Sequence, residues 1–196
     1  CQEHEAAVAR YRRSLELEPD HAPAGMRLAC VLLMRGEFPE GWKAYEWRWR
    51  ERGARPRRFD FTPWRGERAP GRRLLLWGEQ GIGDEILYSS MVGELADAGL
   101  DITLEINSRL LSLMQRSFPR VKVVARADPT AIDPAAFDCQ APLAGLGRWL
   151  RPSFDAFRRH RDYLKAEAEK ASRFQALLLR PAPATVVGVS WSSANR

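Results

Sequence analysis

The spacing of apolar residues changes once along the chain and divides it into two regions. Before about residue 52 the apolar positions recur every three or four residues, which is the period of amphipathic helices. After residue 72, short apolar runs of strand length alternate with helical patterns, as in α/β domains with a parallel sheet. The predicted helices cover residues 3–17, 22–35, 39–52, 84–98, 108–118, 143–150 and 166–179, and the predicted strands cover 73–77, 101–106, 121–124, 137–141 and 184–189.

The helical region contains a spacing of 34 residues. Tyr11 and Tyr45 are 34 positions apart, and so are Ala7 and Gly41. This period resembles the tetratricopeptide repeat, a helical hairpin that needs about three copies for a stable array. Because one full repeat and two half-units are present, we expect either further repeats before Cys1 or packing of these helices against the α/β region. A generic helical hairpin is the alternative interpretation.

The most informative segment of the α/β region is the predicted strand Arg73–Trp77 with the glycine-rich turn that follows it. In doubly wound sheets, ligands bind outside the carboxyl ends of the strands, next to the start of a helix. No Gly-Lys-Ser/Thr follows, which excludes a Walker loop. Ile86 occupies the third glycine position of a dinucleotide fingerprint and Asn107 its acidic position, which excludes that motif as well. The remaining prediction is a close backbone approach at Gly81 and Gly83.

Two carboxylates belong to this turn, and each has two interpretations. Asp84 either caps the helix, accepting from amides two or three residues on, or acts as a general base on a substrate hydroxyl. Glu79 either faces the cleft or pairs with Arg72 or Arg73.

An Arg-, Pro- and Trp-rich segment from Trp47 to Arg73 includes the connector between the two regions. Its tryptophans either hold the helices to the next domain while the arginines stay solvated, or, interleaved with arginine, bind single-stranded nucleic acid. Nucleic acid is the less favoured partner because no nucleic-acid fold is recognisable. The predicted domains are 1–52 (helical repeat), 53–72 (connector), 73–165 (Rossmann-like domain) and 166–196 (a linker helix and the first strand of a second, truncated domain).

Bulk composition adds few constraints. The net charge of +6 comes almost entirely from arginine, with acidic residues interspersed. No run of about 18 apolar residues predicts a membrane span, and no signal peptide is visible. The use of cysteine, without a disulfide framework, favours a reducing, cytoplasmic compartment. The three cysteines predict neither disulfides nor zinc; Cys30 is expected in the core. No histidine pair has metal-ligand spacing. Because the chain starts at Cys1 and stops at Arg196, we interpret it as a fragment of a longer protein.

Several strings in the sequence together resemble a bacterial family of tetratricopeptide-repeat proteins that carry a glycosyltransferase-like domain. That domain is similar to lipopolysaccharide heptosyltransferases and, more distantly, to O-linked N-acetylglucosamine transferases. The resemblance covers essentially the whole chain. Its strings are Gly41-Trp42, Tyr45-Glu46-Trp47-Arg48-Trp49, Pro63-Trp64-Arg65-Gly66, Leu74 through Asp84, Phe137-Asp138, Pro142-Leu143, Tyr163-Leu164 and Val187-Gly188-Val189-Ser190-Trp191.

The resemblance implies a GT-B architecture, in which two Rossmann-like domains enclose the active site. The expected fold is therefore an α/β, Rossmann-like parallel sheet, the N-terminal half of GT-B, preceded by tetratricopeptide-type hairpins. It implies that Asp84 is the catalytic base on the acceptor hydroxyl, while Tyr88 is expected in the core. The expected substrate-binding residues are Glu79, Gln80, Gly81, Ile82, Gly83, Ser190 and Trp191.

The resemblance also implies the reaction partners. The donor is a nucleotide-sugar, the acceptor is a protein or a saccharide, and no metal or other cofactor is expected. The repeat is expected to bind a protein partner, and this fragment alone is expected to be inactive. The alternative function is a non-catalytic interaction scaffold built on the repeats.

Overall fold

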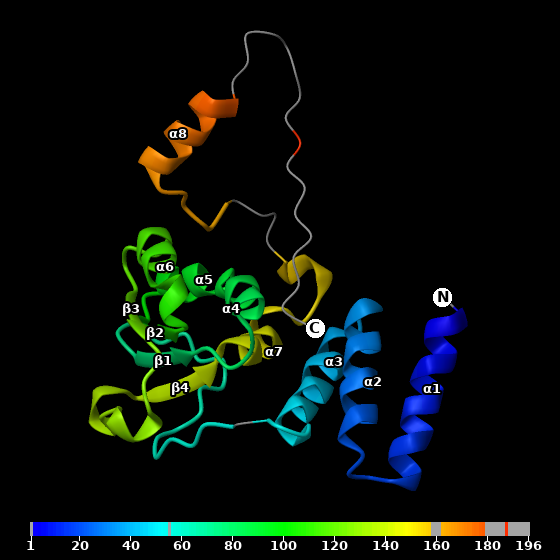
Figure 1. The fold of residues 1–196 in the computed structure, drawn as a ribbon. Helices are drawn as coiled ribbons and strands as arrows, with labels where there is room; N and C mark the ends of the chain where they lie inside the picture. The colour runs from blue at the N-terminus through cyan, green and yellow to red at the C-terminus, as the bar shows by residue number, and fades with distance from the viewer. Residues whose placement is uncertain (1, 55, 158–161, 179–186, 188–196) are drawn as a thin grey trace.

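The computed structural model describes residues 2–54, 56–157, 162–178 and 187. It is an α/β structure in which three N-terminal helices lie beside a parallel sheet (Figure 1). The predicted strand at 184–189 and the predicted site residues Ser190 and Trp191 lie outside the described residues. Among the described helices, none combines the length and apolar content needed to cross a bilayer.

The N-terminal helices are α1 (Gln2–Leu17), α2 (Ala22–Met34) and α3 (Phe38–Ala44), packed in that order along the chain. Their shared core contains Leu28, Ala29 and Leu32, each at most 6% exposed. Gly36, at φ +78°, follows the end of α2 in the left-handed conformation that glycine adopts without strain. Cys30 is exposed, so its predicted place in the core is wrong: it lies on the face of α2 opposite the packed stripe.

The third predicted helix, 39–52, changes type halfway. After α3 the chain continues as a 3₁₀ helix, η1 (Tyr45–Arg50). A 3₁₀ turn aligns residues three apart, which places Tyr45 and Arg48 on one side. The Arg48 guanidinium donates back to the Tyr45 carbonyl at 3.0 Å. This pair faces the α/β region and is buried there.

The sheet has four parallel strands in the order β3-β2-β1-β4. This order is that of the first half of a doubly wound sheet, with its switch point between β1 and β4. The strands agree with the sequence prediction to within two residues: β1 is Arg73–Trp77, β2 is Asp101–Ile106, β3 is Lys122–Ala125 and β4 is Cys139–Pro142.

Helices cover one face of the sheet, where Leu74, Leu76, Ile102 and Leu104 form the main core. The predicted helix 84–98 is two helices, because the Ser89 hydroxyl donates to the Glu85 carbonyl at 2.6 Å, a bond that bends helices. The covering and following helices are α4 (Ile82–Ser89), α5 (Val92–Asp97), η2 (Ser108–Leu110), α6 (Leu111–Ser117), η5 (Leu143–Leu146) and α7 (Gly147–Leu150). Asn107 caps η2: its side chain accepts from the Arg109 amide at 3.0 Å.

The connector, with η3 (Pro129–Ala131) and η4 (Pro134–Ala136), lies by the other face of the sheet. The rings of Trp49 and Phe59 each lie 5.7 Å from that of Trp77 on β1. Arg57 pairs with the buried Glu105 on β2. The tryptophans therefore do pack against the domain, but two arginines of this segment form ion pairs with carboxylates whose side chains are at most 3% exposed, instead of staying solvated. Arg48 is buried and Arg57 is half-buried.

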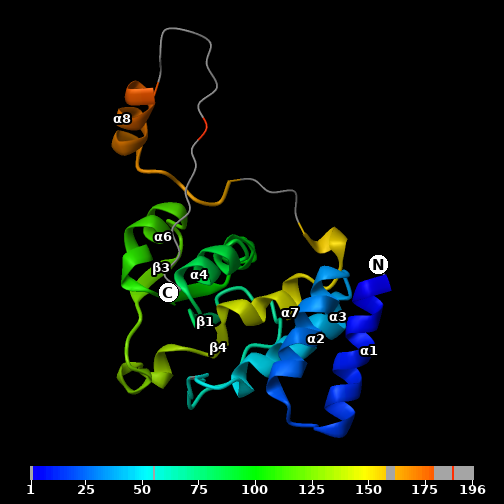
Figure 2. The same ribbon diagram turned by 45° about the vertical axis from the view of Figure 1, so that its right-hand side comes forward.

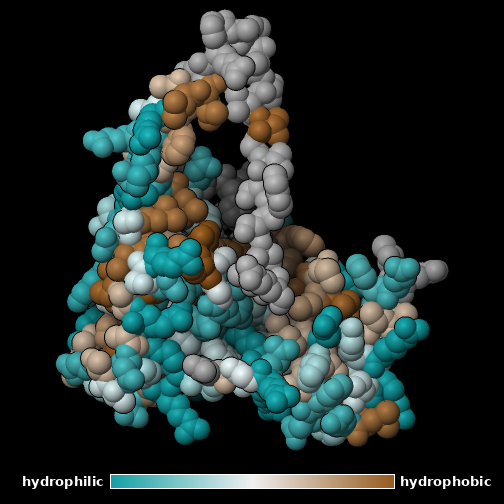
Figure 3. Space-filling view, in the orientation of Figure 1, coloured by the Kyte–Doolittle hydropathy of each residue, from teal (hydrophilic) through white to brown (hydrophobic). Residues whose placement is uncertain are grey.

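After α7 the chain forms η6 (Phe154–Ala156) and, beyond residue 161, helix α8 (Ala168–Leu178). Figures 1 and 2 both show α8 standing apart from the sheet and from α1–α3. Its apolar residues Phe174, Leu177 and Leu178 are exposed. Figure 3, in the orientation of Figure 1, shows brown hydrophobic surface over the region of α8. Hydrogen bonds of Tyr163 and Lys165 attach the preceding segment to Ile86 and Ser117 of the α/β region.

Candidate functional site

The turn between β1 and α4 lies at the carboxyl edge of the sheet. Gly78 is buried, and a Cβ there would overlap the Glu85 carboxylate and lie 2.9 Å from Arg126. Gly81 and Gly83 are exposed, and beside Gly83 a Cβ would meet open space. The close approach of a ligand that the sequence predicts at Gly81 and Gly83 stays a prediction, and the position where the protein itself excludes a side chain is Gly78.

Asp84 lies on the rim, half-buried, at the third position of α4. It is not the N-cap residue: Gly81 holds that position, and its amide donates to Asp84 Oδ2 at 3.1 Å. The carboxylate thus caps the helix from inside its first turn, while its other oxygen, Oδ1, has no hydrogen-bond partner among the described residues. The N-cap interpretation of Asp84 is therefore wrong, because the carboxylate accepts from an amide three residues earlier and not from amides further on. Its role as a base stays a prediction.

Glu85, the next residue, is the carboxylate that the sequence analysis missed. Only 2% of it is exposed, and it lies beneath the turn. Its Oε2 accepts from the Asn107 amide at 2.8 Å, and its Oε1 pairs with Arg126. Burial raises the pKa of Glu85, while the Asn107 amide and Arg126 oppose this change. Glu85 therefore joins the carboxyl ends of β1, β2 and β3 through partners that are distant in the sequence.

Glu79 and Gln80 turn away from the rim and contact the N-terminal helices. Glu79, with 3% of its side chain exposed, pairs with Arg48 at 3.2 Å, not with Arg72 or Arg73 as the sequence suggested. Burial raises the pKa of Glu79 to about 7, although the Arg48 charge favours the carboxylate. The Tyr45 hydroxyl lies 3.0 Å from Gln80 Nε2. The space between the ends of β1 and β4 is thus filled by side chains from η1.

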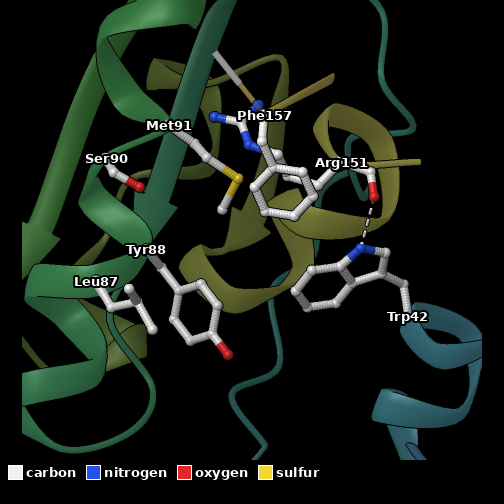
Figure 4. Close-up of a pocket in the computed structure, with 7 residues that line it drawn as sticks. All are labelled: Trp42, Leu87, Tyr88, Ser90, Met91, Arg151 and Phe157. Carbon is white, nitrogen blue, oxygen red and sulfur yellow. Dashed lines mark hydrogen bonds between the residues drawn. The ribbon is translucent and has the colours of Figure 1, made fainter. Parts of the chain in front are cut away.

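A pocket of about 190 Å³ lies along α4, one turn beyond Asp84. Figure 4 shows Tyr88, Met91 and Phe157 facing this space beside Trp42, whose Nε1 donates to the Arg151 carbonyl at 2.8 Å. Leu87, Ser90 and Arg151 complete the lining.

Tyr88 is half-buried, so its predicted place in the core is only partly correct. Its hydroxyl lies 3.1 Å from that of Tyr45. Burial raises the pKa of Tyr88, and so do its hydrogen bond to Tyr45 and the charge of Asp84. Asp84 and Tyr88 are four positions apart on α4, so the pocket lies one helical turn from Asp84.

These features define the class of protein: an α/β protein with a Rossmann-type parallel strand order and a carboxylate on the rim of its carboxyl edge. The chain is similar to Protein FlbA of Caulobacter vibrioides (strain ATCC 19089 / CIP 103742 / CB 15), with 32% identity over 181 residues. The match covers 84% of this chain but only 30% of the length of FlbA. No protein-family model matches the chain, and no solved structure matches it.

Proposed function

We propose that the protein containing this chain is a glycosyltransferase that moves a sugar from a nucleotide-sugar donor to an acceptor hydroxyl. In this proposal the sheet and its helices are the N-terminal half of a GT-B fold, and α1–α3 belong to a tetratricopeptide module that binds a protein partner. The same proposal includes an acceptor that is a protein or a saccharide, a reaction that needs no metal, and a cytoplasmic location. Because the chain spans 30% of the length of FlbA, the activity concerns the whole protein.

One observation carries the proposal: the half-exposed Asp84 stands on the rim where doubly wound sheets bind ligands. Gly81 and Gly83 beside it leave room for a substrate to approach the backbone. The pocket along α4 would hold the part of the acceptor next to the reacting hydroxyl. Asp84 would take the proton from that hydroxyl as it attacks the sugar carbon, and the nucleotide diphosphate would leave.

The experiment compares Asp84→Asn with wild type in the complete protein. Asparagine keeps an oxygen that accepts from the Gly81 amide, so the cap is preserved while the base is lost. We expect transfer from a panel of labelled nucleotide-sugars to fall about 10²–10⁴-fold, the usual contribution of a general base, with little change in melting temperature. Asp97→Asn is the matched control, because that exposed carboxylate pairs with Arg120 away from the rim. Undiminished transfer by Asp84→Asn would remove Asp84 from the mechanism.

A second candidate, a non-catalytic interaction scaffold, is favoured by a different observation. Tyr45 and Arg48 already fill the space at the switch point between β1 and β4, where an open α/β sheet would offer its crevice. A complete protein whose melting temperature no nucleotide-sugar changes, and which transfers none of them, would fit this candidate.

A further inference from the structure

A second pocket lies beside β4 and has a different chemical character. Its volume is about 440 Å³, within the range of small-molecule sites. It shares no lining residue with the pocket along α4. The walls come from the connector, β4 and α7, and the residues that matter for the argument are Pro63, Arg65, Gln140, Pro142, Arg148 and Trp149.

Two arginines at this pocket lack carboxylate partners. Arg65 and Arg148 are exposed, and within the described part of the chain neither forms an ion pair. The buried arginines differ, since Arg48 and Arg151 are each held by carboxylates. The Glu67 carboxylate accepts from the Arg65 backbone amide at 2.9 Å and lies close enough for the Arg65 charge to lower its pKa, but it forms no ion pair with the guanidinium. Two guanidinium groups outside ion pairs on one concave surface make it attractive to an anion.

The indole of Trp149 contacts both Arg148 and the connector next to Arg65. The Arg148 guanidinium carbon lies 5.1 Å from the ring centroid. On the connector, Gly66 packs so closely that a Cβ would lie 3.0 Å from the ring, and its φ of +94° also demands glycine. This contact fixes the backbone next to Arg65. The Pro63-Trp64-Arg65-Gly66 string thus builds one wall of the pocket.

The remaining polar groups favour an uncharged or hydroxyl-bearing portion of a ligand. Gln140 Oε1 accepts from Trp77 Nε1 at 2.7 Å, which leaves the side-chain nitrogen available to donate. The one carboxylate in the lining, Glu46, is already bound by Arg48 at 2.7 Å and by Trp49 Nε1 at 3.2 Å.

We propose that this pocket binds a phosphorylated monosaccharide, with the phosphate between Arg65 and Arg148. Guanidinium groups match phosphate oxygens through paired hydrogen bonds, and two of them balance a dianion. The sugar ring lies against Pro63 and Pro142, and Gln140 donates to a ring hydroxyl. The site does not depend on the proposed transfer reaction, since Asp84 takes no part in it.

The experiment is calorimetric titration of the complete protein with glucose 6-phosphate, ribose 5-phosphate, glucose and inorganic phosphate. We expect a sugar phosphate to bind more tightly than inorganic phosphate or glucose, with an affinity that falls as salt rises. Arg65→Gln and Arg148→Gln should each weaken binding at least about tenfold, the equivalent of one lost charge-assisted hydrogen bond. Arg68→Gln is the control, an exposed arginine of the connector outside the pocket lining.

Three results would overturn the assignment. The first is no binding of either sugar phosphate by wild type. The second is inorganic phosphate binding as tightly as the sugar phosphates, since the pocket walls would then contribute nothing. The third is a loss of affinity in Arg68→Gln as large as in Arg65→Gln and Arg148→Gln, which would show a general effect of the net charge. Because the two changed arginines are exposed, unchanged melting temperatures are expected and would confirm that the variants fold.

Discussion

The buried pair of Arg48 and Glu79 permits a quantitative test of how the helices are joined to the sheet. Their side chains are 5% and 3% exposed, so water cannot replace either partner. Arg48→Met would leave the carboxylate without its nearest cation, a change that typically costs about 3–5 kcal/mol. We expect the free energy of unfolding of the 196-residue chain to fall by up to that amount as the pH rises above about 7, and by less at lower pH, where Glu79 takes up a proton and no buried charge is left unpaired. The double variant Arg48→Met/Glu79→Gln should recover most of the lost free energy of unfolding, because no buried charge remains.

The dependence on pH has a definite sign. Burial raises the pKa of Glu79 from 4.5 to about 7 in the folded chain, so the folded state holds this proton more tightly than the unfolded state. The stabilisation that protonated Glu79 provides is therefore complete below about pH 4.5 and is lost as the pH rises to about 7. At 1.36 kcal/mol per unit of pKa, the loss is about 3 kcal/mol. In Glu79→Gln the free energy of unfolding should not fall over this pH range. In Arg48→Met the fall should continue to higher pH, because Glu79 then loses its proton later.

Urea denaturation followed by circular dichroism measures these free energies, at several values between about pH 5 and about pH 8. Arg73→Met serves as the matched control, because Arg73 pairs with Asp138 on the surface, where such pairs contribute under about 1 kcal/mol. The reasoning fails if Arg48→Met costs no more than Arg73→Met, or if Glu79→Gln and wild type keep parallel pH profiles.

Three further outcomes are expected. Gly78→Ala should destabilise the chain by about 1–3 kcal/mol in urea denaturation, because the new methyl group overlaps the buried Glu85 carboxylate; a neutral result would mean that the turn has room to move. Cys30 should react with a thiol reagent in the folded chain while Cys139 reacts only in denaturant, as mass spectrometry can follow, and equal rates would contradict their different burial. Tyr163→Phe should cost about 1 kcal/mol by removing the 2.9 Å hydrogen bond to the Ile86 carbonyl, and an unchanged denaturation midpoint would refute this.

The sequence predicted the helices and strands well because the spacing of apolar residues depends directly on the local secondary structure. The strand at Arg73–Trp77 and the helix ending at Met34 follow from apolar spacing and from Gly36. Where helices broke or changed type, a specific contact was responsible. The Ser89 hydroxyl bonds back into its own helix, and Arg48 is drawn into the pair with Glu79.

The candidate site was predicted only in part because its partners come from distant positions. The rim position of Asp84 follows from a local pattern of strand, turn and helix. The partner of Glu79 lies 31 residues away and in another region, and composition alone favoured the nearer arginines. The burial of Glu85 needed the Asn107 amide and Arg126, which a linear pattern does not bring together.

Because the connector covers one face of the sheet, it limits where a recombinant fragment of this protein can begin. A recombinant piece that started at Arg73 would bare Leu75 and Trp77, now 1% and 3% exposed, along a whole sheet surface. Such a piece would be prone to self-association, and its aggregation would be mistaken for an intrinsic defect of the sheet. The minimal unit that can be handled in solution therefore has to begin upstream of Tyr45, so that η1 and the connector travel with the strands that they shield.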